Sequence, residues 1–153
     1  MLPTTVDRVP QHTPARYNRR IHSDTQLNIY ESAAGGSREI AERLKELDRE
    51  WDIERLLEAN AASLALTGVV LGATVDRRLL ILPAAVTAFL LQHALQGWCP
   101  PVPLFRRLGF RTAGEINEER TALKLIRGDF DGVRNESQSR MPNVDRILAA
   151  VRR

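Results

Sequence analysis

The chain has 153 residues, a net charge of +3, few aromatic side chains (5%) and one cysteine. This length suits a single domain with tails, and the composition, poor in aromatics but rich in alanine, leucine and arginine, favours an all-α fold over sheet. One cysteine excludes an internal disulfide and a zinc site built from several thiolates, so we expect a cytoplasm-facing protein without a bound metal.

Residues 1–36 are expected to form a basic arm. Three prolines before residue 15 predict extended or irregular backbone through residue 16, followed by a weak helix over 17–32 that ends at AAGGS (33–37). The positive charge is concentrated in residues 1–22, which contain Arg8, Arg16, Arg19 and Arg20 against Asp7. A solvated tail is the simplest interpretation, and anionic lipid or nucleic acid is the alternative. Because no nucleic-acid motif is present, we do not expect nucleic acid as a partner.

A helical domain is expected over residues 37–128, beginning with one long amphipathic helix from Ser37 to Asn60. Its apolar stripe consists of Ile40, Leu44, Leu47 and Trp51. This spacing places the four side chains on one helical face. The stripe is expected to pack on its own protein, with a partner helix or the membrane surface as alternatives.

Charge almost disappears between Ala59 and Phe105, where the only charged residues are Asp76, Arg77 and Arg78. They separate two apolar segments and predict a helical hairpin over residues 59–98. Each segment spans about 25–30 Å, and Pro83 fits the first turn of the second helix. Two interpretations compete: the hairpin crosses a bilayer, or it is the buried centre of a soluble helical bundle.

Small residues favour the membrane interpretation. Ala61, Ala65, Gly68 and Gly72 form one stripe of the first helix, and Ala84 with Ala88 form a similar strip on the second. Close approach of helix backbones at small residues drives helix association in lipid, whereas glycine within a soluble helix costs about 1 kcal/mol relative to alanine. We therefore expect membrane lipid as a partner, together with self-association into a homo-oligomer or a larger complex.

Basic residues flanking the hairpin predict its orientation. Seven occur in the two flanks (Arg43, Lys45, Arg49, Arg55, Arg106, Arg107 and Arg111), against Arg77 and Arg78 in the turn. By the positive-inside rule, both termini are expected in the cytoplasm. Trp98, Arg106 and Arg107 are then expected to anchor the hairpin at the interface, with the arginines facing water or phosphate.

The C-terminal part contains clear helix boundaries. Thr112 and Glu115 form a capping box, and Gly128 provides a stop, which predicts a helix over 113–127. Residues 129–153 are expected to be a linker followed by a short helix capped by Asn143. The apolar face of that helix consists of Val144, Ile147, Leu148 and Val151.

Cys99 is the main candidate for chemistry. Gln92, Gln96 and Cys99 share one helical stripe, with His93 beside it. A reactive thiol requires a positive neighbour or a helix N-terminus, whereas Cys99 follows the end of a helix. We therefore interpret Cys99 as a packing residue where Pro100 and Pro101 stop the helix near Trp98 or Cys99, with a reactive thiol as the alternative. His93 is interpreted as a hydrogen-bonding residue rather than a metal ligand.

The residues from about 50 to 113, and above all GWCP (97–100) and LGFRT (108–112), resemble the YgaP-like inner-membrane domain family of bacteria. The resemblance implies a two-helix membrane hairpin, often self-associating, with a cysteine near the cytoplasmic face. Some members of that family carry a rhodanese domain, which transfers sulfur as a persulfide. This chain contains no second cysteine loop of that kind.

The sequence thus predicts a non-catalytic, membrane-anchored scaffold or accessory subunit of the bacterial inner membrane, whose cytoplasmic helices bind a protein partner. Neither a phosphate-binding loop nor a dinucleotide fingerprint is found, so no cofactor is expected. Two alternatives remain: a sulfur-relay or thiol-redox protein that uses Cys99, and a soluble, cytoplasmic all-α interaction protein with the hairpin as its core.

Overall fold

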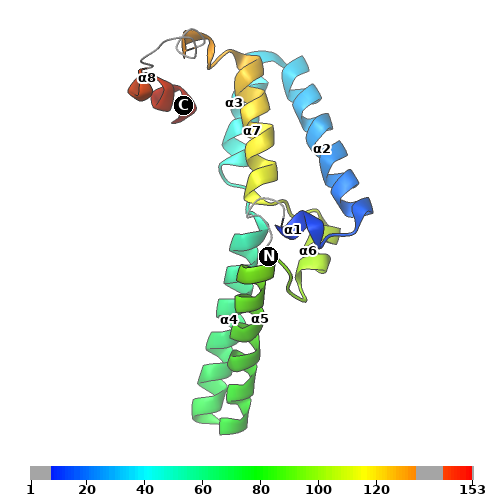
Figure 1. Ribbon diagram of the computed structural model, residues 1–153, viewed down its shortest axis with the longest axis vertical. Helices are drawn as coiled ribbons and strands as arrows, with labels where there is room; N and C mark the ends of the chain where they lie inside the picture. Colours follow the sequence, from blue (N-terminus) through cyan, green and yellow to red (C-terminus); the bar gives the residue numbers. More distant parts are fainter. Residues whose placement is uncertain (1–7, 134–142, 153) are drawn as a thin grey trace. The chain divides into compact units, whose positions relative to one another are not determined.

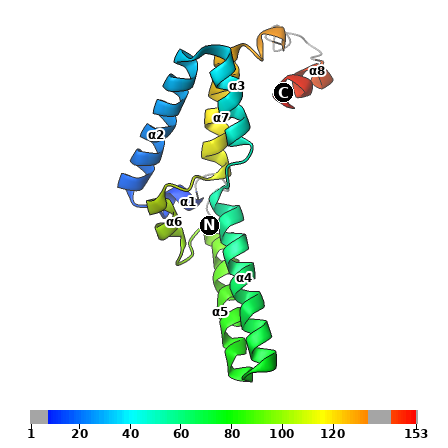
Figure 2. The same ribbon diagram turned by 180° about the vertical axis from the view of Figure 1, so that it is seen from behind.

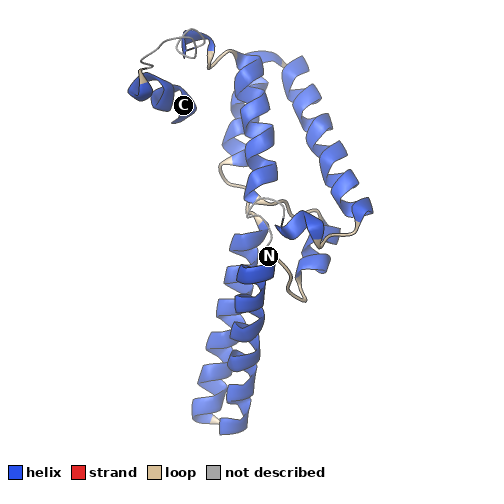
Figure 3. Ribbon diagram, in the orientation of Figure 1, coloured by secondary structure: helices blue, strands red, loops and turns tan. Residues whose placement is uncertain are grey.

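The computed structural model describes residues 8–133 and 143–152, and within these ranges the chain is helical with no strand (Figure 3). The predicted all-α class is therefore confirmed. The elements in chain order are α1 (Arg8–Gln11), α2 (Ala15–Ala34), α3 (Gly36–Leu47), α4 (Ile53–Thr74), η1 (Arg77–Leu80), α5 (Ile81–Gln96), α6 (Val102–Leu108), α7 (Ala113–Arg127), η2 (Asp131–Val133) and α8 (Val144–Arg152).

Two compact units share these elements. The first contains Met1–Ser23 and Trp51–Ile116, and the second contains Asp24–Glu50 and Asn117–Arg153. This division differs from the expected boundaries after residues 36 and 128. The N-terminal segment belongs with the hairpin because Val9 is buried among Ile53, Leu57, Cys99 and Val102, which lie far away in sequence.

The predicted hairpin is present in the first unit, where α4 and α5 lie side by side in both views (Figures 1 and 2). Helix α4 begins at Ile53 because the Asp52 side chain accepts a 2.7 Å hydrogen bond from the backbone N–H of Arg55. At the turn, the Asp76 side chain accepts in the same way from the N–H of Arg78. Pro83 lies in the first turn of α5, as expected.

The expected continuous helix from Ser37 to Asn60 is wrong. Helix α3 ends at Leu47, and α4 begins only at Ile53, after a short non-helical segment. Two interactions fix the new start: the Asp52 cap and a 2.8 Å hydrogen bond from the N–H of Ile53 to the carbonyl of Arg111. Trp51 thereby leaves the predicted stripe and is exposed, with the Arg55 guanidinium 4.3 Å from its ring centroid.

Two proline-containing segments are helical, and the first of them was expected to be extended or irregular. Residues 8–11 form α1, closed by the Thr13 hydroxyl, which donates to the carbonyl of Val9 at 2.8 Å. The rest of the predicted extended arm, residues 1–7, lies outside the described residues. Residues 102–108 form α6, because Pro103 falls in its first turn, where a missing N–H is tolerated.

The second helix of the hairpin also ends earlier than expected. Helix α5 ends at Gln96, and Gly97 follows in the left-handed conformation with φ 76°. Glycine adopts this conformation without steric cost, so the helix is closed before the chain reaches Pro100. The prediction that the prolines stop the helix near Trp98 or Cys99 was therefore wrong in its cause and its position.

Several boundaries in the C-terminal part are confirmed. Helix α7 spans Ala113–Arg127, and Thr112 and Glu115 exchange both hydrogen bonds of the capping box. Gly128 ends the helix with φ 86°. The Asn143 side chain accepts from the N–H of Arg146 at 3.0 Å and so caps α8. Most of the expected polar linker, residues 134–142, lies outside the described residues.

The second unit is held together by α3 and the later part of α7. Ile40, Leu44 and Leu47 of the predicted stripe are buried, as is Leu123 of α7. Glu119 is also buried, and its carboxylate accepts a 2.7 Å hydrogen bond from the guanidinium of Arg43. Over residues 144–151 of α8, Ala150 is buried, while Val144, Leu148 and Val151 are exposed.

Candidate functional site: the apolar hairpin and the polar junction at its base

The small residues of α4 face its partner helix. Gly68 and Gly72 are buried, and Ala61 and Ala65 on the same stripe are partly buried. A Cβ atom added at Gly68 would come 2.5 Å from Cδ of Pro83, and one added at Gly72 would come equally close to the side chain of Leu80. These distances are below van der Waals contact, so the close approach of the two segments depends on glycine.

The expected strip on α5 does not face α4. Ala84 and Ala88 are exposed, whereas Pro83, Val86 and Leu90 are partly buried. The contact is therefore asymmetric: glycines of the first helix receive larger side chains of the second. This arrangement follows from Pro83, whose ring packs directly against Gly68 and sets the rotation of α5.

Apart from this contact, the hairpin exposes an apolar surface. Both helical segments are long and apolar enough to cross a bilayer, one over Ile53–Thr74 and one over Arg77–Gln96. Within the most apolar window of each, only 17% and 6% of residues are buried inside the chain. The large exposed side chains are Leu64, Leu66, Val69, Val70, Leu71, Val75, Leu79, Leu80, Ile81, Leu82, Phe89, Leu91 and Leu95.

The hydroxyl groups on the hairpin are bonded within their own helices. Ser63 donates to the carbonyl of Ala59 at 2.7 Å, and Thr67 donates to the carbonyl of Ser63 at 2.8 Å. Thr74 and Thr87 likewise donate to the carbonyl four residues earlier. These four hydroxyls therefore need no water as a hydrogen-bond acceptor.

Cys99 lies in the core at the base of the hairpin, the end opposite η1. Its side chain is 6% exposed and packs with Val9, Ile53, Leu57 and Val102. Burial raises the pKa of the Cys99 thiol, which disfavours the reactive thiolate. An apolar groove of about 200 Å³ also reaches this residue; its lining includes Leu64, Phe89 and Leu90. The position agrees with a packing role, as the sequence suggested.

His93 and Gln96, the other candidates for thiol chemistry, do not gather at one site with Cys99. Gln96 is exposed, whereas the His93 ring is buried and neither ring nitrogen has a hydrogen-bond partner among the described residues. The expected role of His93 as a hydrogen-bonding residue is thus not seen. The polar residue that joins the helices here is Arg8, which donates to the carbonyl of Ala94 at 3.1 Å and lies 3.7 Å from the Glu54 carboxylate.

The interface anchors that the sequence suggested have different environments. Trp98 is partly buried and Arg107 is exposed. Arg106 is only 1% exposed, so the expectation that it faces water or phosphate is wrong. It points into the unit because Glu115 offers a carboxylate at the start of α7, held in place by the capping box with Thr112.

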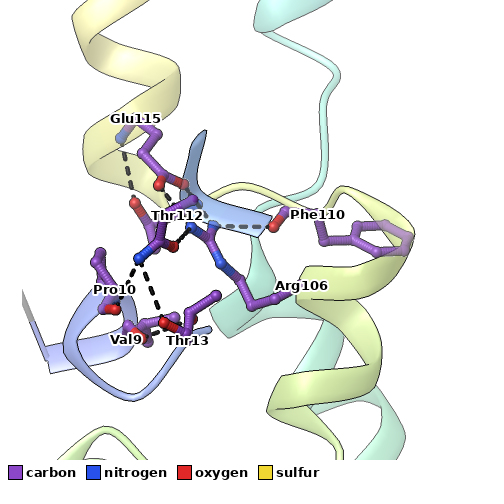
Figure 4. A network of polar contacts seen from close by, with 8 residues as sticks. Val9, Pro10, Thr13, Arg106, Phe110, Thr112 and Glu115 are labelled. Atoms are coloured by element: carbon purple, nitrogen blue, oxygen red, sulfur yellow. Dashed lines mark hydrogen bonds and ion pairs between the residues drawn. The ribbon is translucent and has the colours of Figure 1, made fainter. Parts of the chain in front are cut away.

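Arg106 is the centre of a hydrogen-bonded junction at the base of the hairpin (Figure 4). Its two terminal nitrogens donate to the two oxygens of Glu115 at 2.6 and 2.7 Å. It also donates to the carbonyl of Phe110 and to the side chain of Asn18, which in turn donates to the carbonyl of Pro10. The junction therefore connects α1, α2, α6 and the start of α7.

The ionic state of this junction follows from its hydrogen bonds. Burial alone would raise the pKa of Glu115, but hydrogen bonds from Arg106 and from the backbone of Thr112 outweigh it, and the pKa is lowered. The pair is therefore ionised near neutral pH. Sequence reasoning found the Thr112 and Glu115 box but missed Arg106 and Asn18, because no local spacing connects residues 88 positions apart.

The described residues contain no group of three or more His, Cys, Asp or Glu side chains placed to hold a metal ion. No family model, curated protein or solved structure was found to match the chain.

Proposed function

We propose that the chain is a non-catalytic scaffold or accessory subunit anchored in the bacterial inner membrane by its hairpin. The observation that carries this proposal is the exposure of most of the large apolar side chains on α4 and α5 beyond the base of the hairpin. A helix pair at the centre of a soluble bundle buries such side chains within its own chain. The exposed apolar side chains of α4 and α5 must therefore be covered by material outside this chain. Lipid hydrocarbon would cover them on all sides of the helix pair.

The dimensions and polar groups of the hairpin support insertion. At about 1.5 Å per residue, its two segments are about 33 and 30 Å long, against a hydrocarbon thickness of about 30 Å. Every hydroxyl described above is bonded inside its own helix, as an apolar surrounding requires. The charged residues of the turn, Asp76, Arg77 and Arg78, lie together at one end.

The scaffold role rests on the second unit. Its described surface exposes Leu125 and Ile126 of α7, as well as Leu148 and Val151 of α8. A separate acid-lined groove of about 270 Å³ includes Glu31, Glu39, Glu42 and Glu46. Protein interfaces use both kinds of surface, since burial of apolar side chains contributes affinity and charge contributes orientation.

The sulfur-relay alternative has less support. It requires an accessible thiolate, whereas Cys99 is buried and burial raises its pKa. The neighbouring Arg106, which the relay would use to stabilise the thiolate, is engaged by Glu115. Packing is therefore the role that we propose for Cys99.

A cysteine at the turn tests both insertion and orientation. We suggest Arg77→Cys in a Cys99→Ala background, labelled in intact cells with a membrane-impermeant maleimide. The turn should react from outside, because the seven flanking basic residues favour a cytoplasmic location for both ends of the hairpin. Arg38→Cys, on the exposed surface of α3, is the matched control and should react only after the cells are opened. Labelling of the turn only in broken cells would contradict the topology.

A further inference from the structure

A basic face at the start of α2 is fixed in orientation by the interactions of the opposite face. Arg16, Arg19 and Arg20 are all exposed, and their spacing puts them within one arc of the helix. Ile21 is buried, and Asn18 is bonded to both Pro10 and Arg106. Because the inward face is held by these contacts, the three arginines point away from the unit.

Further exposed arginines belong to the same unit. Arg55 lies in the first turn of α4, stacked on Trp51, and Arg107 lies on α6. In Figure 1, α6 and the first turns of α2 lie near the base of the hairpin, away from η1.

Most of the described carboxylates of this unit are engaged in contacts away from these exposed arginines. Glu54 is paired with Arg8 and Glu115 with Arg106, while the side chain of Asp52 caps α4. Glu58 is exposed near the base, and Asp76 lies at the opposite end in the turn. Among the described residues of this unit near the base, the exposed charged side chains are thus five arginines (Arg16, Arg19, Arg20, Arg55 and Arg107) and one carboxylate (Glu58).

We propose that these exposed arginines at the base of the hairpin bind anionic phospholipids in preference to zwitterionic ones. This inference rests on the proposed insertion of the hairpin. The partner is argued from charge complementarity and from continuity with the apolar surface. Arg55 precedes by less than three turns the exposed Leu64 and Leu66, so a lipid whose tails cover the hairpin places its phosphate near the level of the arginines. Guanidinium groups bind phosphate through paired hydrogen bonds, and a net negative headgroup adds long-range attraction.

The test uses the full chain in phosphatidylcholine nanodiscs that contain a minor fraction of lipid with brominated acyl chains. The brominated lipid is either phosphatidylglycerol or phosphatidylcholine, and the readout is quenching of Trp51 and Trp98, which both lie at the base. We expect stronger quenching by brominated phosphatidylglycerol at equal fraction, and a loss of the difference at high salt.

Variants assign the preference to the basic face. Arg16→Gln, Arg19→Gln and Arg20→Gln together should reduce it, by up to about fivefold in relative affinity for each arginine removed. Replacement of the same three residues by lysine should retain most of it. The matched control is Arg77→Gln with Arg78→Gln at the turn, which should leave the quenching of both tryptophans unchanged. All of these side chains are exposed, so matching circular dichroism spectra are expected.

The outcomes distinguish this inference from the proposed function. If neither brominated lipid quenches either tryptophan, the hairpin is not inserted and both proposals fail. If both lipids quench equally, the hairpin is inserted but the lipid preference is overturned. A preference that survives the triple glutamine change overturns the role of these arginines. Binding of a short RNA through the same arginines, without any lipid preference, would assign the face to nucleic acid instead.

Discussion

At the scale of single residues, Arg106 was predicted from the sequence to be a membrane anchor, but it is the buried centre of a hydrogen-bonded junction. It follows three prolines and precedes another arginine, a pattern typical of an interface. Its side chain is buried because a carboxylate, a carbonyl and an amide lie within hydrogen-bond distance. Arg107, one position later, lies outside the junction and stays exposed. The difference between the two arginines is thus made by tertiary contacts.

The junction predicts a large effect of Glu115→Gln on stability. The change leaves the buried guanidinium without its counter-ion, which costs about 3 kcal/mol in the free energy of unfolding. The measurement is denaturant unfolding in detergent micelles. Arg107→Gln, on the exposed neighbour, is the control and should change this free energy by less than about 0.5 kcal/mol.

The same pair gives the effect a defined pH dependence. Since the pKa of Glu115 is lowered in the folded state, its contribution is complete above the ordinary glutamate pKa, about 4.3, and is lost as the pH falls through the folded value. The difference between wild type and Glu115→Gln should therefore be constant from neutral pH to about pH 5 and shrink in stronger acid. A difference that grows on acidification would contradict the ionised pair.

At the scale of elements, Gly97 joins the end of α5 to α1. It has φ 76°, and a Cβ atom there would come within 2.6 Å of the backbone of Arg8. The glycine thus serves two needs, a left-handed helix end and a close approach of another segment. Gly109, after α6, has a similar φ of 96° but nothing within 4 Å of the position of a Cβ.

These two glycines provide a matched comparison. Gly109→Ala should cost only the conformational strain, about 1 kcal/mol. Gly97→Ala should cost at least about twice as much, because α1 must also move away from the helix end. Thermal unfolding gives the total cost, and hydrogen exchange of the amides around Val9 reports the docking of α1. Equal effects of the two changes would show that the approach of Arg8 contributes nothing.

How far the sequence predicts an element depends on where its determinants lie. The hairpin follows from a long uncharged stretch, and α7 follows from a local capping box and a terminal glycine. Helix α1 was missed because the prolines before residue 15 suggest extended chain, and no helix was predicted over residues 102–108. Burial of Val9 and Val102 in a shared core stabilises both helices. The break after Leu47 was missed because it depends on a hydrogen bond from Ile53 to Arg111, and the whole hairpin separates these two residues in the sequence.

The same distinction applies to the site. Glycines 68 and 72 could be placed on the contact face from their spacing alone, since α4 is regular. The facing residues of α5 could not, because the rotation of that helix is set by the ring of Pro83 against Gly68. Ala84 and Ala88 consequently lie outside the contact.

At the scale of the whole molecule, the two surfaces rich in exposed leucine should respond differently to charge. Leu66 on the hairpin is 66% exposed and Leu125 in the second unit is 61% exposed. In water, arginine at either position is nearly neutral. In a bilayer, arginine near the centre of a helix costs about 3 kcal/mol of insertion free energy.

Leu66→Arg should therefore reduce the fraction of protein that resists carbonate extraction, while Leu125→Arg should leave that fraction unchanged. Extraction of isolated membranes followed by immunoblotting measures both. Identical behaviour of the two variants would indicate that the hairpin is covered by protein or water rather than by lipid.

The burial of Val9 among residues that come much later in the chain has a consequence for synthesis on the ribosome. Its partners extend to Val102, so the packing site of α1 does not exist until more than ninety further residues have been made. If the hairpin inserts as proposed, the nascent N-terminal segment therefore stays undocked while both hairpin helices enter the membrane. The docking of α1 would then be a late, posttranslational folding step, in which the first residues synthesised pack against the completed base of the hairpin.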